Sequence, residues 1–206
     1  MTRFYIADTH LDHPPILKWT GRPFDSVEEM NDAVVEAWNK VVGRKDEVHI
    51  AGDFAFKRHG RWCNALNGKK FLVLGNHDGM NKEALAGLSD ALEPTDVKAI
   101  QQFRNVQALA EYRYLGQSVA LSHYWLGTWD GMFEGAWNLH GHVHGRRRES
   151  LPGQVGHVGL WLDVGWDVHG RPIAFEEVDL MMREKIAMMP QGFRERACRH
   201  MARHRK

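Results

Sequence analysis

Five short polar clusters, each directly after an apolar run, constrain the fold of this chain more than any other feature of its sequence. The runs are 4–7, 48–51, 71–74, 119–121 and 137–140, and the clusters after them are 8–10, 52–53, 75–78, 122–123 and 141–144. Short apolar runs bounded by polar and glycine residues are typical of buried strands. We therefore expect five strand ends to deliver oxygen and nitrogen atoms to one rim of the fold.

The polar clusters carry the donor groups of a transition-metal site. Imidazole and carboxylate groups suit Mn, Fe, Ni, Zn or Co, and neither cysteine of the chain belongs to a cluster. Asp8 and His10 are two residues apart, as are His142 and His144. On extended segments each pair would face one side and could chelate one ion. The carboxylate of Asp53, with two oxygens, could bridge two ions.

Each cluster alone also has a plain structural interpretation. An isolated Asp-x-His segment is usually a turn or a helix cap, and short motifs often match by chance. All five clusters occur in order here, each behind a strand-like run. Glycines at positions 52, 75 and 141 would leave space for a close approach of the backbone. The whole set therefore favours a metal site over five unrelated turns.

The ordered set resembles the calcineurin-like metallophosphoesterases, whose pattern is D-x-H, G-D, G-N-H-D/E, H and G-H-x-H. All five blocks are present, over about the first three quarters of the chain. Segments 8–13, 22–24 and 52–56 are also similar to a compact bacterial and phage branch of that family. The resemblance implies an α/β fold, a four-layer αββα sandwich of two mixed β-sheets, with the metal site at the carboxyl-terminal ends of the strands.

The resemblance further implies two divalent metal ions, Mn²⁺ foremost, with Fe, Ni, Co and Zn as alternatives. Asp53 would bridge them. The first ion would be surrounded by Asp8, His10, Asp53 and His144, and the second by Asp53, Asn76, His123 and His142.

By the same resemblance, His77 matches the histidine that contacts the phosphoryl group and protonates the leaving oxygen, and Asp78 would orient its imidazole. A hydroxide shared by the metals would attack phosphorus in line. The expected protein is an enzyme that hydrolyses phosphodiesters or phosphomonoesters, with small molecules or nucleotides as the leading substrates. The alternatives are a metal-dependent nuclease acting on DNA or RNA and a non-catalytic, phosphoesterase-like scaffold that binds proteins. Retention of every predicted ligand and of His77 argues against the scaffold.

Four residues near the clusters are candidates for contact with substrate phosphate. His13 could meet the phosphate or be a solvated turn histidine. Arg22 could pair bidentately with phosphate or form a surface salt bridge. Lys57 and Arg58 belong to a loop that could recognise an anion or be solvated. The arginine run 146–148, by contrast, favours a solvated face.

The segments between the clusters predict the rest of the architecture. Ser26 can cap a helix that runs to Val41 with an apolar face. A shorter helix is expected over 82–92. Segments 160–165 and 173–178 predict two strands of a closing hairpin. The aromatic residues of 124–137 favour core packing over stacking on a nucleobase.

A chain of 206 residues with 43% hydrophobic content predicts one domain over 1–182 and a basic helical tail over 183–206, part of the same domain or docked on it. Six Arg, two Lys and two Glu give the tail a net charge of +6. It could bind nucleic acid through counterion release, bind an acidic patch on another subunit, or be a solvated terminal helix. The chain shows no signal-peptide pattern and no apolar run near the ~20 residues of a membrane helix. We therefore expect a cytoplasmic protein without a membrane partner; the sequence indicates no oligomeric state.

Overall fold

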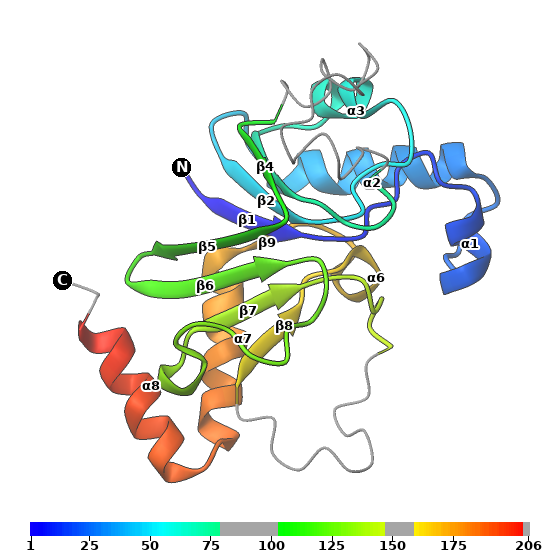
Figure 1. Cartoon of the computed structure of the whole chain (residues 1–206). Coiled ribbons are helices and arrows are strands. Elements are labelled where there is room, and N and C mark those ends of the chain that lie inside the picture. The colour runs from blue at the N-terminus through cyan, green and yellow to red at the C-terminus, as the bar shows by residue number, and fades with distance from the viewer. Residues whose placement is uncertain (79–102, 147–158, 204–206) are drawn as a thin grey trace, which may run out of the picture.

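The computed structural model describes residues 1–78, 103–146 and 159–203, and it consists of two mixed β-sheets with helices packed around them (Figure 1). The first sheet is parallel except for one edge strand, which is antiparallel to its neighbour. Its strands, in spatial order, are β4 (Asn105–Gln107), β3 (Lys69–Val73), β2 (Glu47–Ala51), β1 (Arg3–Ile6) and β9 (Ile173–Ala174). The expected α/β sandwich with two mixed sheets is confirmed.

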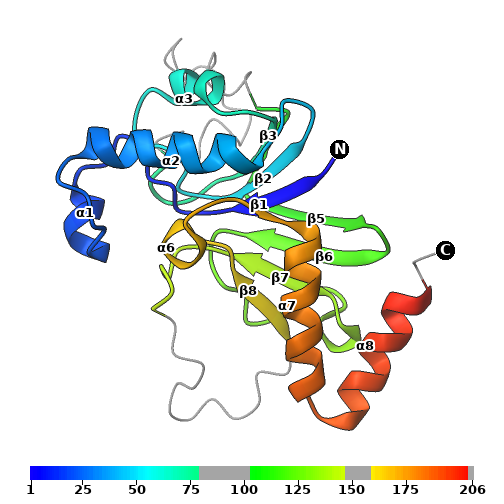
Figure 2. The ribbon, with the colours of Figure 1, turned by 180° about the vertical axis from the view of Figure 1, so that it is seen from behind.

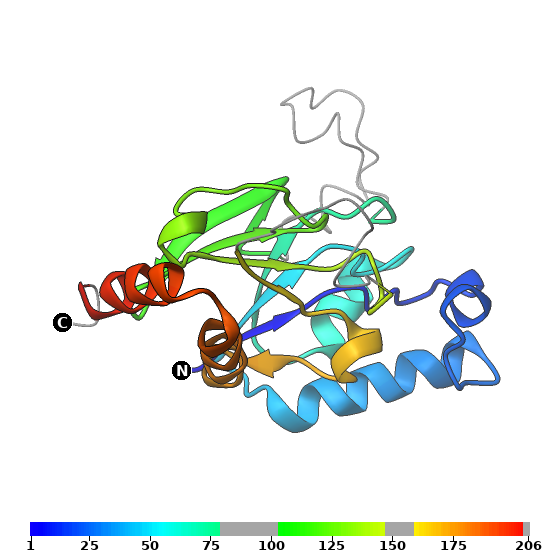
Figure 3. The same cartoon turned by 90° about the horizontal axis from the view of Figure 1, so that it is seen from below.

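The second sheet lies beside the first and has four strands. Its order is β5 (Leu109–Tyr114), β6 (Gln117–Ser122), β7 (Trp137–His140) and β8 (Leu160–Asp163), with β5 antiparallel to β6 and the other pairs parallel. One residue separates β4 from β5, so the chain passes directly from one sheet to the other. Figure 3 shows the two sheets as separate layers, with α2 on the far side of the first.

Helix α2 (Val27–Val41) covers the outer face of the first sheet together with α3 (His59–Ala65). The Ser26 side chain accepts a hydrogen bond from the Glu29 amide at 3.1 Å, as expected of an N-cap. Met30, Val34 and Trp38 are spaced by about one helical turn and are fully buried. The helix expected to start at Ser26 and run to Val41 is therefore confirmed.

One hydrophobic core lies beneath α2 and α3, and another lies between the two sheets, where the C-terminal helices pack against it. Helix α7 (Phe175–Met188) packs against β8 and β1, and α8 (Gln191–Arg203) packs against the short 3-10 helix η2 (Met132–Glu134) (Figure 2). The position between 182 and 183, expected as a domain boundary, lies inside α7. On α8, three apolar residues are buried in the core between the sheets: Phe193, Ala197 and Met201.

The expected closing hairpin is wrong. β8 and β9 belong to different sheets, α6 (Trp166–His169) lies between them, and β9 ends at Ala174. Phe175, Val178 and Met182 are buried at helical spacing, so the apolar pattern that suggested a strand is the start of α7. The expected helix over 82–92 and the arginines 147–148 lie outside the described residues. Among the described helices, none has the length and apolar character needed to span a membrane.

A buried histidine between the sheets gives the fold a pH dependence. The His49 ring stacks on Phe71 at 4.7 Å and lies 5.1 Å from the Tyr112 ring, and the Glu47 carboxylate, at 3.9 Å, is too far to form a hydrogen bond. Burial, helped by the charge of Arg3, lowers the pKa of His49 from 6.5 to about 3. The native protein therefore holds this ring neutral over a range in which the unfolded chain is protonated.

Stability should therefore fall as the pH drops from 6.5 toward 3, because only the unfolded chain binds the proton in that window. In His49→Phe, which keeps an aromatic ring, the loss of unfolding free energy between pH 7 and pH 4.5 should be smaller by about 2 kcal/mol. Urea unfolding at the two pH values measures the difference. Equal acid losses in the two proteins would contradict a neutral, buried His49.

Candidate metal centre

The five polar clusters meet at one rim, at the end of the molecule opposite the N-terminus (Figure 1). Asp8 follows β1, Asp53 follows β2, and the histidine clusters follow β6 and β7. Backbone hydrogen bonds from the Asp8 amide to the Gly52 carbonyl, at 3.0 Å, and from the His10 amide to the Asp53 carbonyl, at 2.9 Å, hold the first two loops side by side. The expected position of the clusters at the carboxyl ends of the strands is confirmed.

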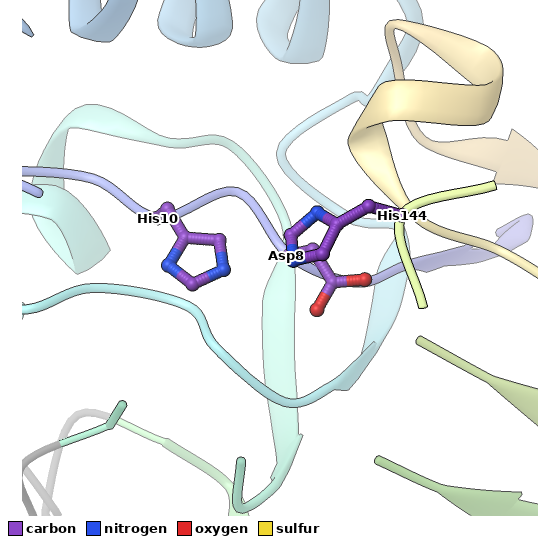
Figure 4. Close-up of side chains that lie close together, drawn as sticks. All are labelled: Asp8, His10 and His144. Carbon is purple, nitrogen blue, oxygen red and sulfur yellow. The ribbon is translucent and has the colours of Figure 1, made fainter. Parts of the chain in front are cut away.

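The clusters form two groups of potential metal ligands. Within each group, one ligand atom from each residue lies within 4.8 Å of the others. The first group is Asp8, His10 and His144, drawn together in Figure 4, and the second is Asp53, His123 and His142. Each group takes residues from both sheets, and each is a subset of one ligand set that the sequence resemblance implies.

Asp53 lies between the two groups. Its Oδ2 is 3.3 Å from His10 Nε2 and 3.4 Å from His123 Nε2, so one carboxylate oxygen faces a histidine of each group. Its Oδ1 accepts a hydrogen bond from the His77 amide at 2.8 Å, which fixes the carboxylate. Asn76 Oδ1 lies 2.9 Å from His123 Nε2, so the amide oxygen belongs to the second group. This is the arrangement that a bridging carboxylate requires.

The ligand pairs converge through left-handed backbone and not through strand alternation, so the expectation of extended segments is wrong. Positive φ is uncommon outside glycine, although Asp, Asn and His tolerate it best, and it stores local strain. Five of the potential ligands adopt it: Asp8 (56°), His10 (50°), Asp53 (52°), His142 (70°) and His144 (50°). Side chains two residues apart meet here because the backbone turns sharply between them.

Two of the glycines are required by close contacts with the carboxylates, as expected. A Cβ on Gly75 would overlap the Asp53 carboxylate and amide, and a Cβ on Gly141 would lie 2.6 Å from Asp8 Oδ2. Such distances do not occur between real Cβ atoms and their neighbours. The backbone of these loops therefore forms part of the wall behind the carboxylates.

In two histidines, one ring nitrogen has a polar partner, which leaves the other nitrogen available to the centre. His123 Nδ1 donates to the Ala51 carbonyl at 2.9 Å, and His144 Nδ1 lies 2.6 Å from Asp167 Oδ2. The pKa of His123 is about 9, because the Asp53 and Asp8 carboxylates outweigh the effect of burial. Partners of this kind fix the ring orientation of metal-binding histidines. Asp167, on α6, is a residue of the candidate centre that sequence reasoning missed.

Burial shifts the pKa values of two residues of the first group, Asp8 and His10. It raises the pKa of Asp8 to about 7 and lowers the pKa of His10 to about 2. His10 Nε2 is buried and has no hydrogen-bond partner among the described residues, so a neutral ring presents a lone pair at the centre. Neutral imidazole and a carboxylate that a cation would keep ionised form a donor set that fits divalent transition metals.

The two residues of the Asn-His-Asp block with expected catalytic roles differ in position. His77 is half-buried, with its ring 5.4 Å from the His10 ring. Asp78 is 1% exposed and accepts hydrogen bonds from the amides of Asp53 at 2.9 Å, Phe54 at 2.6 Å and Gly75 at 2.7 Å. The expectation that Asp78 orients the His77 imidazole is therefore wrong, because its carboxylate binds buried loop amides.

Three of the four candidate phosphate contacts, His13, Lys57 and Arg58, have different surroundings. His13 is 3% exposed and its Nδ1 lies 3.0 Å from His10 Nδ1, so a solvated turn histidine is wrong and phosphate contact stays a prediction. Lys57 is exposed, and its role stays a prediction. Arg58 pairs with the buried Asp12 carboxylate, with Nε to Oδ2 at 2.8 Å, so it is neither unpaired nor simply solvated.

Arg22 is a structural residue, so neither expected role is right. Its guanidinium is buried and makes two hydrogen bonds of 2.8 Å to Asp167, the residue that also binds His144. It further donates to the carbonyls of Asp8 at 2.6 Å and Thr9 at 3.0 Å. These bonds occupy the guanidinium nitrogens that would otherwise bind a phosphate, and they connect α6 to the loop after β1.

Arg22→Met should therefore lower the unfolding free energy by about 3 kcal/mol, because it leaves the partly buried Asp167 without its cation. The affinity for inorganic phosphate should stay within about twofold, since protein acceptors already occupy the buried guanidinium. Denaturant unfolding and calorimetry with inorganic phosphate test the two parts, with the exposed Arg44→Met as the matched control. Unchanged stability with a weakened affinity for phosphate would restore the phosphate role.

Comparison with known proteins identifies relatives without a stated activity. No protein-family model matches the chain. An uncharacterized protein of Methanocaldococcus jannaschii, MJ1445, is 30% identical over 154 residues, which cover 72% of this chain and 73% of the relative. The Gene 66 protein of Mycobacterium phage D29 is 29% identical over 191 residues, covering 78% of this chain and 89% of its own. The Gene 66 protein of phage L5 is 34% identical over 90 residues, covering 39% and 43%.

A solved structure has a similar fold. The protein of unknown function AQ665 from Aquifex aeolicus superposes with a TM-score of 0.62 over 87% of this chain and 98% of its own. The sequence identity is 22%, so the likeness shows a shared fold alone.

Proposed function

We propose that the chain, which belongs to the same family as the uncharacterized Methanocaldococcus jannaschii protein, is a calcineurin-like phosphoesterase that uses two divalent metal ions. The observation that carries the proposal is the position of Asp53. One of its oxygens lies 3.3 Å from a histidine of the first ligand group and 3.4 Å from a histidine of the second. Two groups joined by one carboxylate support a pair of adjacent ions, the arrangement that serves phosphoester hydrolysis in many enzymes.

The residues that would hold the ions are those of the two groups with Asn76. Bound ions of this kind supply a nucleophile at neutral pH and neutralise the charge of the phosphate. The chain itself supplies the positioning: the His77 amide fixes Asp53, and Asp167 fixes the His144 ring. The His77 imidazole is half-buried beside His10, where it can donate a proton to a departing oxygen.

The remaining alternatives gain less support. The basic α8 lies away from the rim that holds the ligand groups, so it adds nothing to the case for a nuclease (Figure 1). A non-catalytic scaffold would not need two ligand groups with the His77 imidazole beside them. Hydrolysis of a small-molecule or nucleotide phosphoester is therefore the function that we propose.

The proposal is tested with protein stripped of metal and reloaded with Mn²⁺. We expect bound metal to approach two ions per chain and hydrolysis of p-nitrophenyl phosphate or bis-p-nitrophenyl phosphate to require it. In His77→Ala, hydrolysis should fall by about a hundredfold or more while the metal content is kept. Failure to bind metal would overturn the proposal, and two bound ions without hydrolysis of either ester would favour the scaffold.

A further inference from the structure

Large aromatic side chains are exposed around the ligand groups. Among the described residues, the exposed large aromatics are Trp19, Phe56, Tyr124 and Phe133, with exposed fractions of 54%, 42%, 48% and 55%. The first three adjoin histidines of the candidate centre or its flank, whereas Phe133 lies on η2. Exposed aromatic faces beside a polar site are unusual enough to need a reason, because the fold gains little from them.

The aromatic residues continue a stack of rings that starts on the ligands. His144 stacks on His10 at 5.2 Å and 27°, His10 on His13 at 5.1 Å and 26°, and His13 on Phe56 at 4.8 Å and 20°. Phe56 therefore ends, at the protein surface, a column of four rings in which each ring stacks on the next. A flat group bound there would extend the same column by offset stacking.

Trp19, at the end of α1 (Pro15–Thr20), stands beside this column. Its ring lies edge-on to His13 at 5.2 Å and 82°, and 6.0 Å from the His77 ring at 47°. Trp19 and Phe56 therefore flank His13 on two sides. Together they form what we call the aromatic platform, next to the histidine that would face the leaving group.

Cations accompany the platform. Lys57 is exposed with its ammonium 5.7 Å from the Phe56 ring, and Arg146 donates a hydrogen bond to the Trp19 carbonyl and is also exposed. Positive charge beside flat apolar faces suits a ligand that carries both a phosphate and a planar ring. A lipid or a peptide would not need this combination.

The distance between the aromatic platform and the metal-ligand groups further restricts the kind of molecule that could bind there. His13 lies between Phe56 and His10, so a planar group on Phe56 cannot be bonded directly to a phosphate held at the ligand groups. A spacer is required between ring and phosphate. The sugar of a nucleotide provides that spacer, whereas an aryl phosphate has none.

We propose that Trp19 and Phe56 bind the nucleobase of a nucleoside phosphoester whose phosphate lies at the two ligand groups. The proposal rests on the proposed function for the position of the phosphate, and it adds the substrate class and two specificity-determining residues. Stacking on aromatic side chains tolerates any base, so recognition of the nucleoside should depend little on base identity.

Two p-nitrophenyl esters with the same leaving group test the platform in Mn²⁺-loaded protein. The native chain should prefer thymidine 5'-(p-nitrophenyl phosphate) over methyl p-nitrophenyl phosphate by about tenfold or more in kcat/KM. Trp19→Ala and Phe56→Ala should reduce this ratio toward one, and Trp19→Phe should keep most of it. Phe133→Ala, which removes an exposed aromatic ring elsewhere, is the matched control and should keep the native ratio.

A binding measurement separates this proposal from the proposed activity. By calorimetry, adenosine 5'-monophosphate should bind about tenfold or more tightly than ribose 5-phosphate, and Trp19→Ala should remove the difference. If the esters are hydrolysed but the nucleoside gives no preference, the platform is overturned and the phosphoesterase stands. If neither ester is hydrolysed while the binding difference depends on Trp19, the platform stands and the proposed hydrolysis falls. Preferences that survive both alanine substitutions would also overturn the platform.

Discussion

Replacing Asp53 by Asn should lower metal-dependent phosphoester hydrolysis by more than the ~100-fold that loss of an outer-shell partner costs. The substitution keeps size and shape but removes the negative charge that would lie between two cations. Because Asp53 faces both ligand groups, we expect the content of both ions to fall, not that of one. Steady-state kinetics and total metal analysis of the same preparation measure the two effects.

The matched control for Asp53 is Asp32→Asn, which makes the same chemical change at an exposed position on α2. It should leave both metal content and kcat/KM within about twofold, as expected of an isolated surface site. An Asp53→Asn protein with two ions and native turnover would contradict the bridging role. Loss of one ion only would assign Asp53 to a single group.

Asp78→Asn should lower the unfolding free energy by about 3 kcal/mol or more. The Asp78 carboxylate accepts three buried amide hydrogen bonds, and bonds to a charged acceptor contribute about 1.5–3 kcal/mol each. An Asn side chain has one oxygen acceptor, and its amino group would face amide donors. Denaturant unfolding of metal-free protein measures the effect without interference from bound ions.

His77→Ala is the matched comparison for the unfolding of Asp78→Asn. His77 is the neighbour of Asp78 in sequence but is only half-buried, so its removal should lower the unfolding free energy by no more than about 1 kcal/mol. His77→Ala should thus lose activity and keep its stability, whereas Asp78→Asn should lose stability. A stable Asp78→Asn protein with a reduced kcat would instead support an orienting role for Asp78.

The sequence pattern was sufficient to predict which residues meet. Asp8, Asp53, His123 and His142 each follow a strand, and strand ends of the two sheets share one rim, so chain position translated directly into spatial proximity. The backbone that brings them together was not predictable in the same way. Left-handed φ at Asp8 and His10 is imposed by the surrounding loops and leaves no mark in apolar periodicity.

Residues that act through packing were missed for a related reason. Asp167 belongs to none of the five polar clusters, and its partners, Arg22 and His144, are distant in sequence. Asp78 lies beside His77 in the chain, which suggested a contact that its buried carboxylate does not make. The strand expected over 173–178 failed because a short apolar run fits the start of α7 equally well.

The division of each ligand group between the two sheets also bears on how the protein resists unfolding over time. Ions bound at this rim would fasten one sheet to the other, so pulling the sheets apart would require breaking coordination bonds first. Because binding to the folded state alone raises the free energy of unfolding, loaded protein would open more rarely than stripped protein. Ions bound at the rim that we propose for chemistry would then also slow proteolysis and lengthen the lifetime of the chain.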